Sequence, residues 1–339
     1  MKFNPARIRN GLTLTDLCVI LVMIMMLLAI MPALHRTASE RDHLVQCASN
    51  LKYIAAGMIE YSNRNNGKYP RTNFDTKSSV LTQYTGVNAS NPFGPGGPQV
   101  NDVSGSIWLL YRSSGLDPKY FVCPGSDADA YDPAVSGSPL TKSNFTSRQN
   151  LSYSFECPYP TMNSLMGRFG WDNSSLSSDF PLAADMNPGT PALLLVTPTS
   201  SASQMADANS PNHGRIGQNV LYGDYHVEFT QSPFCGSVLH GATGQIRDNI
   251  YTSQPGKYRD DNQTPYPAVA EVIGGQPRDQ FDAVLLPLAT AGFQPPLKPH
   301  AQTGVSIIMG GGILLVVIGI IVAVMVLRAR NPARPPPLP

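Results

Sequence analysis

The sequence predicts an α+β protein: a long N-terminal helix packed on an antiparallel β-sheet, a loop-rich remainder and a further apolar helix near the C-terminus. Two apolar runs and one hairpin-like segment lead to this prediction. Proline and glycine, at 31 and 29 of 339 residues, favour turns and loops between these elements. The length allows one large or two small domains beyond the apolar runs.

The first apolar run covers residues 17–34 and contains no polar side chain apart from a cysteine. A membrane-spanning helix needs about 17–25 apolar residues, so residues 12–34 are expected to cross a membrane. A secretory signal peptide is the first alternative, but its apolar region is usually about 7–15 residues long and ends at a small-residue cleavage site. A plain signal anchor is the second alternative.

The start of this run has a distinctive order of residues. A basic leader ends at Gly11, Leu12 follows, and Asp16 is the first acidic residue of the chain. This order resembles the type IV prepilin signal. The resemblance implies that residues 1–11 are a leader, that prepilin peptidase cleaves between Gly11 and Leu12, and that the new amine of Leu12 is methylated. Leu12 and Asp16 stand where that signal usually has Phe and Glu.

The helix is expected to continue well past the apolar run. Apolar residues recur at steps of three and four between Leu44 and Met58, which is the spacing of one helical face. The sequence 65–67, Asn-Asn-Gly, and then Pro70 predict the end of the helix. We therefore expect one helix over residues 12–66, whose second half covers a sheet.

The polar middle of the chain, residues 67–300, is predicted to be the exported domain. A long loop over 71–105 comes first and a short helix over 107–111 follows. Strands are expected at 120–124, 151–155 and 192–197. Residues 218–229 alternate around a Gly-Asp pair and predict a β-hairpin.

These segments together resemble the pilin-like proteins of Planctomycetes that carry the domain of unknown function DUF1559 and a processing-associated His-x9-Asp-Gly motif. The resemblance covers residues 11–287 and implies a pilin-like fold and a secretion or filament context, without enzymatic activity or a cofactor. Ten residues rather than nine separate His213 from Asp224, and Tyr225 replaces the usual glycine. The segments that carry it are 47–54, 121–124, 212–213, 219–227, 248–252 and 284–287.

His213, Asp224 and His226 are the candidate residues for chemistry. Two imidazoles and a carboxylate are a plausible zinc set. The alternative is that Asp224 shapes a turn and that both histidines make structural hydrogen bonds, and we expect no metal. A serine-hydrolase site is not expected, because the sequence has no Gly-x-Ser-x-Gly motif.

Four cysteines lie in the polar middle, and an even number in an exported region permits two disulfides. Spacing alone does not rank the three pairings. The four are Cys47, Cys123, Cys157 and Cys235.

The second apolar run, residues 305–327, has no charged side chain, and Arg328, Arg330 and Arg334 follow it. It predicts a second transmembrane helix whose C-terminal end is cytoplasmic. The N-terminal leader is basic as well, so both termini are expected in the cytoplasm and residues 36–300 outside it. Residues 328–339 are then a Pro-rich cytoplasmic tail.

Together these features favour a pseudopilin-like structural subunit of the cytoplasmic membrane, in a type II secretion or type IV pilus-like system. Its partners would be prepilin peptidase, other pilin-like subunits and the membrane. The alternative is a membrane-anchored exported binding domain that never enters a filament. Nucleic acid is not an expected partner, because the net charge is only +1.

Overall fold

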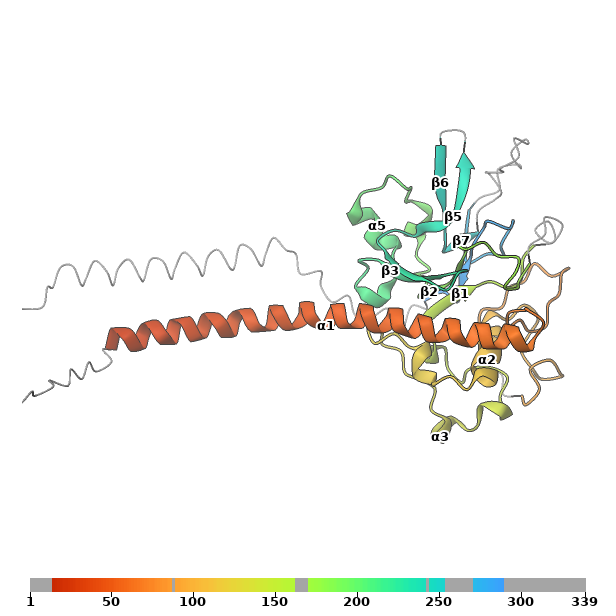
Figure 1. Cartoon of the computed structure of the whole chain (residues 1–339), viewed down its shortest axis with the longest axis horizontal. Coiled ribbons are helices and arrows are strands. Elements are labelled where there is room, and N and C mark those ends of the chain that lie inside the picture. The colour runs from red at the N-terminus through yellow and green to blue at the C-terminus, as the bar shows by residue number, and fades with distance from the viewer. Residues whose placement is uncertain (1–13, 87–88, 162–169, 242–243, 254–270, 290–339) are drawn as a thin grey trace, which may run out of the picture. The chain divides into compact units, whose positions relative to one another are not determined.

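The computed structural model describes residues 14–86, 89–161, 170–241, 244–253 and 271–289 (Figure 1). The chain divides into two compact units. Residues 40–297 form one of them, called the core unit below, and residues 1–39 with 298–339 form the other.

The longest element is helix α1, Leu14–Arg64. In the core unit its stripe of apolar side chains is buried, with Leu51 and Ile54 fully inaccessible to solvent. The helix ends where the sequence predicts, because Asn66 and Gly67 adopt positive φ angles of 54° and 79°. The second half of α1 is thus held by packing rather than by helix propensity alone.

The main sheet has five antiparallel strands in the order β4-β3-β2-β1-β9. The central pair, β1 and β2, places Tyr153 opposite Asp185. Strand β9, the last one along the described residues, pairs with β1 at the other edge. The strands are β1 (Tyr153–Glu156), β2 (Pro181–Asp185), β3 (Gln218–Tyr222), β4 (Val227–Thr230) and β9 (Leu285–Leu286).

Two further strand pairs and several short helices complete the core unit (Figure 1). Strand β5 pairs with β6, and β7 pairs with β8. These strands are β5 (Phe234–Gly241), β6 (Gly244–Asn249), β7 (Thr252–Ser253) and β8 (Val272–Ile273). The α-helices after α1 are α2 (Val103–Ser114), α3 (Pro133–Ser136) and α5 (Ala202–Ala208). The 3-10 helices are η1 (Pro118–Phe121), η2 (Pro139–Thr141), η3 (Arg148–Asn150), η4 (Pro191–Leu194) and η5 (Pro211–His213).

One hydrophobic core joins α1, α2 and the sheet. Trp108 of α2 lies at the centre of an aromatic group, with the rings of Tyr131 and Phe145 packed edge-on at 5.0 and 4.9 Å. The indole N–H donates to the carbonyl oxygen of Lys142 at 2.8 Å, so the buried ring leaves no unpaired donor. Helix α1 is closely approached at Gly57, where an added Cβ would lie 2.7 Å from Leu116, just after α2, and 3.5 Å from Leu110 of α2.

The predicted hairpin over residues 218–229 is confirmed as β3 and β4, with Gln218 opposite Thr230. Two predicted strands are wrong. Residues 120–124 lie at the end of η1 and in the following loop. Residues 192–194 lie in η4 and residues 195–197 in the turn after it, where Leu195 is 80% exposed. In both cases a proline at the first helical position fixes φ and begins a 3-10 turn where a strand was expected.

The predicted fold class also needs correction. The structure is a mixed helix-and-sheet protein with a five-stranded antiparallel sheet. Across the described part of the chain, no helix is long and apolar enough to cross a membrane. Residues 12–34 are expected to span a membrane as the first part of one helix over residues 12–66; the structure has this helix as α1, Leu14–Arg64, which continues from the apolar run through charged residues.

The predicted location in the cytoplasmic membrane with two spans is contradicted by the same finding. It depended on the lengths of two apolar runs. The leader at residues 1–11, the second run at 305–327 and the tail at 328–339 all lie outside the described residues.

Candidate functional site

A buried disulfide between Cys47 and Cys123 is the first component of the candidate site. Cys47 lies on α1, and Cys123 lies in the loop after η1. Both residues are fully inaccessible to solvent. The bond joins positions 76 residues apart and therefore fastens the long helix to the domain that follows it.

His213 and Asp185 form an ion pair beside this disulfide. The Nε2 atom of His213 lies 3.1 Å from Oδ2 of Asp185 and 3.6 Å from Sγ of Cys123. His213 is the last residue of η5, and Asp185 is the last residue of β2. These four side chains, Cys47, Cys123, Asp185 and His213, are called the cystine–histidine cluster below. All four are buried.

The carboxylate of Asp185 is held by hydrogen bonds in addition to the ion pair. The backbone N–H of Asn219 on β3 donates to Oδ2 at 2.7 Å, and the side-chain amide of Asn219 donates to the same atom at 3.2 Å. The side-chain amide of Asn212 donates to Oδ1 at 3.2 Å. Such a network makes a buried carboxylate tolerable and fixes its orientation.

The charge of His213 follows from this environment. Burial lowers the pKa of an imidazole, but here the nearby Asp185 carboxylate opposes it through charge and a hydrogen bond, and the pKa of His213 is raised overall. The protonated ring is therefore favoured at the ion pair.

The other side of the histidine ring is tightly enclosed. Its Nδ1 atom is buried and has no hydrogen-bond partner among the described residues. Gly125 makes this packing possible, since an added Cβ there would lie 2.4 Å from the carbonyl oxygen of Asn212 and 3.1 Å from Nδ1 of His213. The site therefore requires a residue without a side chain at position 125.

The structure does not bring together the predicted zinc set. His213 is in the core, whereas Asp224 and His226 lie in the exposed turn between β3 and β4. There Asp224 accepts a hydrogen bond from the backbone N–H of His226 and pairs with its ring, which lowers the pKa of Asp224. The ring of His226 stacks on that of Tyr222 at 4.5 Å. The three residues therefore belong to two separate places.

The remaining predicted site residues are also separated. Cys157 and Cys235 are buried free thiols, so the second of the two permitted disulfides is not formed by these residues. Burial raises the pKa of Cys157 well above its usual range and that of Cys235 to about 12, so both thiols stay protonated. Asp16 lies in the first turn of α1, and the predicted cleavage site at Gly11 and Leu12 lies outside the described residues.

Sequence analysis missed Asp185 and Asn219. Asp185 ends a strand of small residues that was not predicted, and its histidine partner is far away along the chain. The alternation of the hairpin identified residue 219 as part of a strand, but no local signal indicated that it faces Asp185.

The assembled cluster places a disulfide, which a thiol can reduce, next to an imidazole and a carboxylate.

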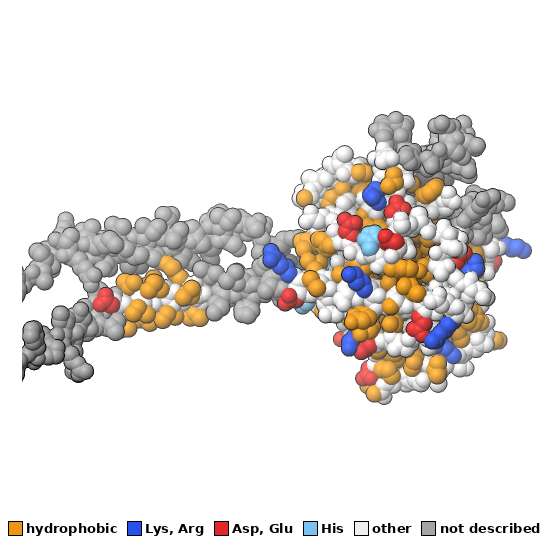
Figure 2. Space-filling model, viewed as in Figure 1, with side chains coloured by type: hydrophobic (Ala, Val, Ile, Leu, Met, Phe, Trp, Pro, Cys, Tyr) orange, Lys and Arg blue, Asp and Glu red, His pale blue; other side chains and the backbone are white. Residues whose placement is uncertain are grey.

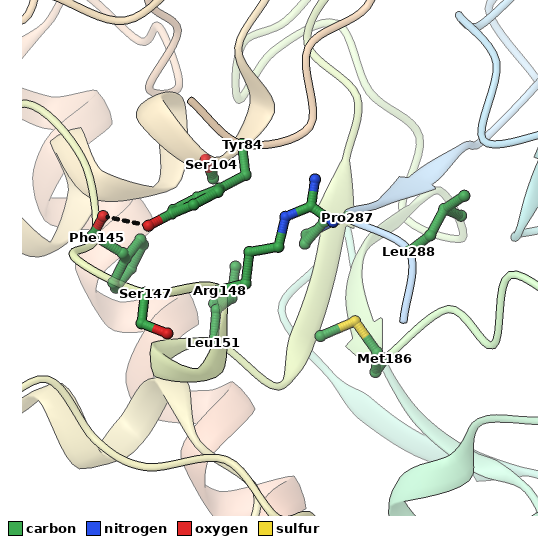
Figure 3. A pocket seen from close by; sticks show the side chains of 9 residues that line it. All are labelled: Tyr84, Ser104, Phe145, Ser147, Arg148, Leu151, Met186, Pro287 and Leu288. Atoms are coloured by element: carbon green, nitrogen blue, oxygen red, sulfur yellow. Dashed lines mark hydrogen bonds between the residues drawn. The ribbon is translucent and has the colours of Figure 1, made fainter. Parts of the chain in front are cut away.

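A small surface pocket is the other candidate site (Figure 3). Its cavity volume is about 20 Å³, and the side chain of Arg148 extends across its middle. Tyr84 donates to the carbonyl oxygen of Phe145 at 3.1 Å, and the guanidinium group lies 5.6 Å from the centre of the Tyr84 ring. Met186 and Leu288 line the far side. A cavity of this size has room for about one water molecule, so the buried cluster is the stronger candidate.

Comparisons with protein-family models, with curated proteins and with solved structures find no match to this chain.

Proposed function

We propose that the chain is a pseudopilin-like assembly subunit of a type II secretion or type IV pilus-like system. Prepilin peptidase would cleave it between Gly11 and Leu12, and the chain would then associate with other pilin-like subunits through the first part of α1. The proposal assigns no enzymatic activity to the chain. Its support is the apolar surface of α1 together with the order of residues at the N-terminus.

The exposed apolar residues of α1 carry the proposal. Between residues 17 and 28 the large hydrophobic side chains are about half exposed, for example Leu17 at 49%, Leu21 at 50% and Met25 at 61% (Figure 2). Burying one such side chain contributes about 1.5–3 kcal/mol, so a continuous surface of them favours association. The occupant we propose is the same stretch of another subunit, because a helix that is apolar on all sides packs well among identical helices.

The first turn of α1 supports a role for Asp16 in this proposal. The helix begins at Leu14, and its first turn contains Asp16, where the helix dipole favours a negative charge. Cleavage before Leu12 would leave a new amine close to this first turn. We propose that Asp16 pairs with the new amine of its own or a neighbouring subunit, which offsets the cost of a carboxylate among apolar side chains.

Mass spectrometry of the mature N-terminus tests the processing step. We expect a chain that begins with methylated Leu12 when the protein is made together with prepilin peptidase. Gly11→Val should abolish cleavage, whereas Asn10→Ala, one position earlier, should leave it unchanged. A wild-type chain that still begins at Met1 would contradict the proposal.

Cross-linking through Cys18 tests assembly. This thiol is exposed and lies two positions from Asp16, so a bismaleimide should join neighbouring subunits there. Asp16→Ala should reduce the cross-linked fraction several-fold, and Asp16→Glu, which keeps the charge, should retain most of it. Equal cross-linking in the wild type and in Asp16→Ala would count against the role of Asp16, and no cross-linking in any variant would count against assembly through this stretch.

A further inference from the structure

The cystine–histidine cluster brings four metal-ligating side chains to one point. One ligand atom from each of Cys47, Cys123, Asp185 and His213 lies within 4.8 Å of all the others. They come from α1, from the loop after η1, from the end of β2 and from η5, so four separate parts of the core unit converge here. Two sulfurs, an imidazole and a carboxylate form a ligand set that zinc accepts.

We propose that reduction of the Cys47–Cys123 disulfide converts this cluster into a tetrahedral site for a divalent transition metal of the zinc type. The reductant is a dithiol. It supplies two electrons and two protons, becomes a disulfide itself, and leaves two thiols at Cys47 and Cys123. The metal ion then displaces both thiol protons and the Nε2 proton of the His213 imidazolium, all three of which pass to solvent, and binds two thiolates together with the neutral imidazole and the carboxylate.

The geometry of the fixed ligands already fits such a site. Zinc binds nitrogen and oxygen at about 2.0–2.2 Å and sulfur at about 2.3 Å, so the edges of a tetrahedral site measure about 3.3–3.8 Å. The two distances from His213 Nε2, 3.1 Å to Asp185 Oδ2 and 3.6 Å to Cys123 Sγ, are close to these edges. Once the S–S bond is broken, rotation of the two cysteine side chains supplies the remaining adjustment.

The charge balance also fits a zinc-type ion. Two thiolates and one carboxylate around a divalent ion leave one net negative charge, as in a Cys3His zinc site. Asn219 and Asn212 already donate hydrogen bonds to Asp185 and would orient it as a ligand. Partners of this kind outside the metal ligands typically improve affinity about 10- to 100-fold.

Burial indicates a structural rather than a catalytic metal. Cys47, Cys123 and Asp185 are fully inaccessible and His213 is 2% exposed, so no position is left open for water or substrate. A closed four-ligand site fastens elements together. The metal would therefore take over the task of the disulfide, which is to hold α1 against the sheet, when the chain is in a reducing environment.

Cobalt binding by the full-length chain tests the proposal. The chain is reduced with a dithiol, desalted without oxygen and titrated with Co2+, and we expect one ion per chain. Thiolate-to-cobalt charge-transfer absorption and the visible bands of tetrahedral cobalt should appear, and Zn2+ should remove both. The oxidised chain should show neither signal. Cys47→Ser and His213→Gln should each weaken binding at least tenfold.

Matched variants separate this site from other ligands. Cys18→Ser removes an exposed thiol and His226→Gln an exposed histidine, so both should leave the cobalt spectrum unchanged. His213→Cys keeps four ligands and should increase charge-transfer absorption in proportion to three thiolates instead of two. A spectrum that survives in Cys47→Ser and His213→Gln would overturn the proposal, as would a folded, reduced chain without thiolate absorption.

A second measurement covers the case in which the reduced chain folds only with metal bound. Circular dichroism is recorded during reduction with and without Zn2+, because a metal that binds the folded state alone adds its binding free energy to folding. We expect zinc to preserve the folded signal. Loss of that signal at the same rate with and without zinc would overturn the proposal.

Discussion

Two groups of buried ionisable residues in the core unit have opposite surroundings. In the cystine–histidine cluster, the Asp185 carboxylate faces the imidazole of His213 and accepts amide hydrogen bonds on both oxygens. The second group, called the buried acid pair below, consists of Glu156 and Asp248. Each accepts one backbone hydrogen bond, from Val284 and Ala283 respectively, and its other oxygen has no partner among the described residues.

The electrostatic consequence differs accordingly. Burial raises the pKa of Glu156 and of Asp248 well above the usual range, and the nearby Asp282 carboxylate raises both further. The acid pair therefore holds protons, whereas in the cluster the ion pair stabilises the charge on His213. Equal burial thus gives different protonation, and the presence of a countercharge makes the difference.

Removing the countercharge should have the largest effect. Asp185→Asn leaves the His213 ring without a carboxylate and places an amide among hydrogen-bond donors, so we expect a loss of about 3–5 kcal/mol in the free energy of unfolding. Urea denaturation measures it. Asp224→Asn, which neutralises a carboxylate beside a histidine in the exposed turn, should change stability little. A small effect at Asp185 as well would remove the contrast between the two groups.

Removing the disulfide should have the second-largest effect on stability. Replacing both Cys47 and Cys123 by Ala should lower the free energy of unfolding by about 4 kcal/mol, because a crosslink of this span restricts the unfolded chain. Denaturation without reductant is the measurement, and Cys18→Ala is the control. A dithiol should destabilise the wild type but not the double variant. If the dithiol destabilises both equally, the disulfide does not carry this stability.

A smaller effect is expected from crowding the histidine. Gly125→Ala places a Cβ against the carbonyl oxygen of Asn212, and backbone cannot move aside as easily as a side chain can. We expect a loss of about 1–3 kcal/mol. Gly94→Ala is the matched control, because its closest neighbour is the side chain of Asn91. The unfolding temperatures of the two variants are compared with that of the wild type. An equal decrease in both would mean that the backbone contact at Gly125 does not limit the size of the residue there.

The acid pair should give the smallest effect and a characteristic pH dependence. The pKa of Glu156 is higher in the folded than in the unfolded chain, so the folded state binds more protons and stability falls as the pH rises above the unfolded pKa. Glu156→Gln should flatten this fall. The free energy of unfolding of the variant, relative to that of the wild type, should be about 1 kcal/mol higher at pH 8 than at pH 5. Glu228→Gln, on an exposed position of β4, is the control. Parallel pH profiles for Glu156→Gln and the wild type would contradict the assignment.

Local features of the fold were predictable from the sequence. The end of α1 at Asn66 and Gly67 and the hairpin of β3 and β4 depend on residues close together in the chain. Strand β9 was harder, because it contains only Leu285 and Leu286 and exists through its pairing with β1. The proline-led turns at η1 and η4 resembled strands because apolar residues surround them.

The candidate site was less predictable, because its residues meet only through the fold. His213 was identified, but it was grouped with Asp224 and His226 on the basis of proximity in sequence. The turn between β3 and β4 exposes those two residues, and the actual partner, Asp185, ends a strand that was not predicted. The pairing of Cys47 with Cys123 likewise depends on where η1 places its loop relative to α1.

The distance along the chain between β1 and β9 has a consequence for biosynthesis. Val284 lies 128 residues after Glu156, its hydrogen-bond partner. At 5–20 residues per second, a ribosome needs roughly 6–26 s to make the intervening chain. During this time the edge of β1 is open, and Glu156 is in water and ionised. A charged side chain on an open edge opposes pairing with foreign strands. We therefore expect the residue that lowers the stability of the finished protein at high pH to oppose aggregation of the nascent chain.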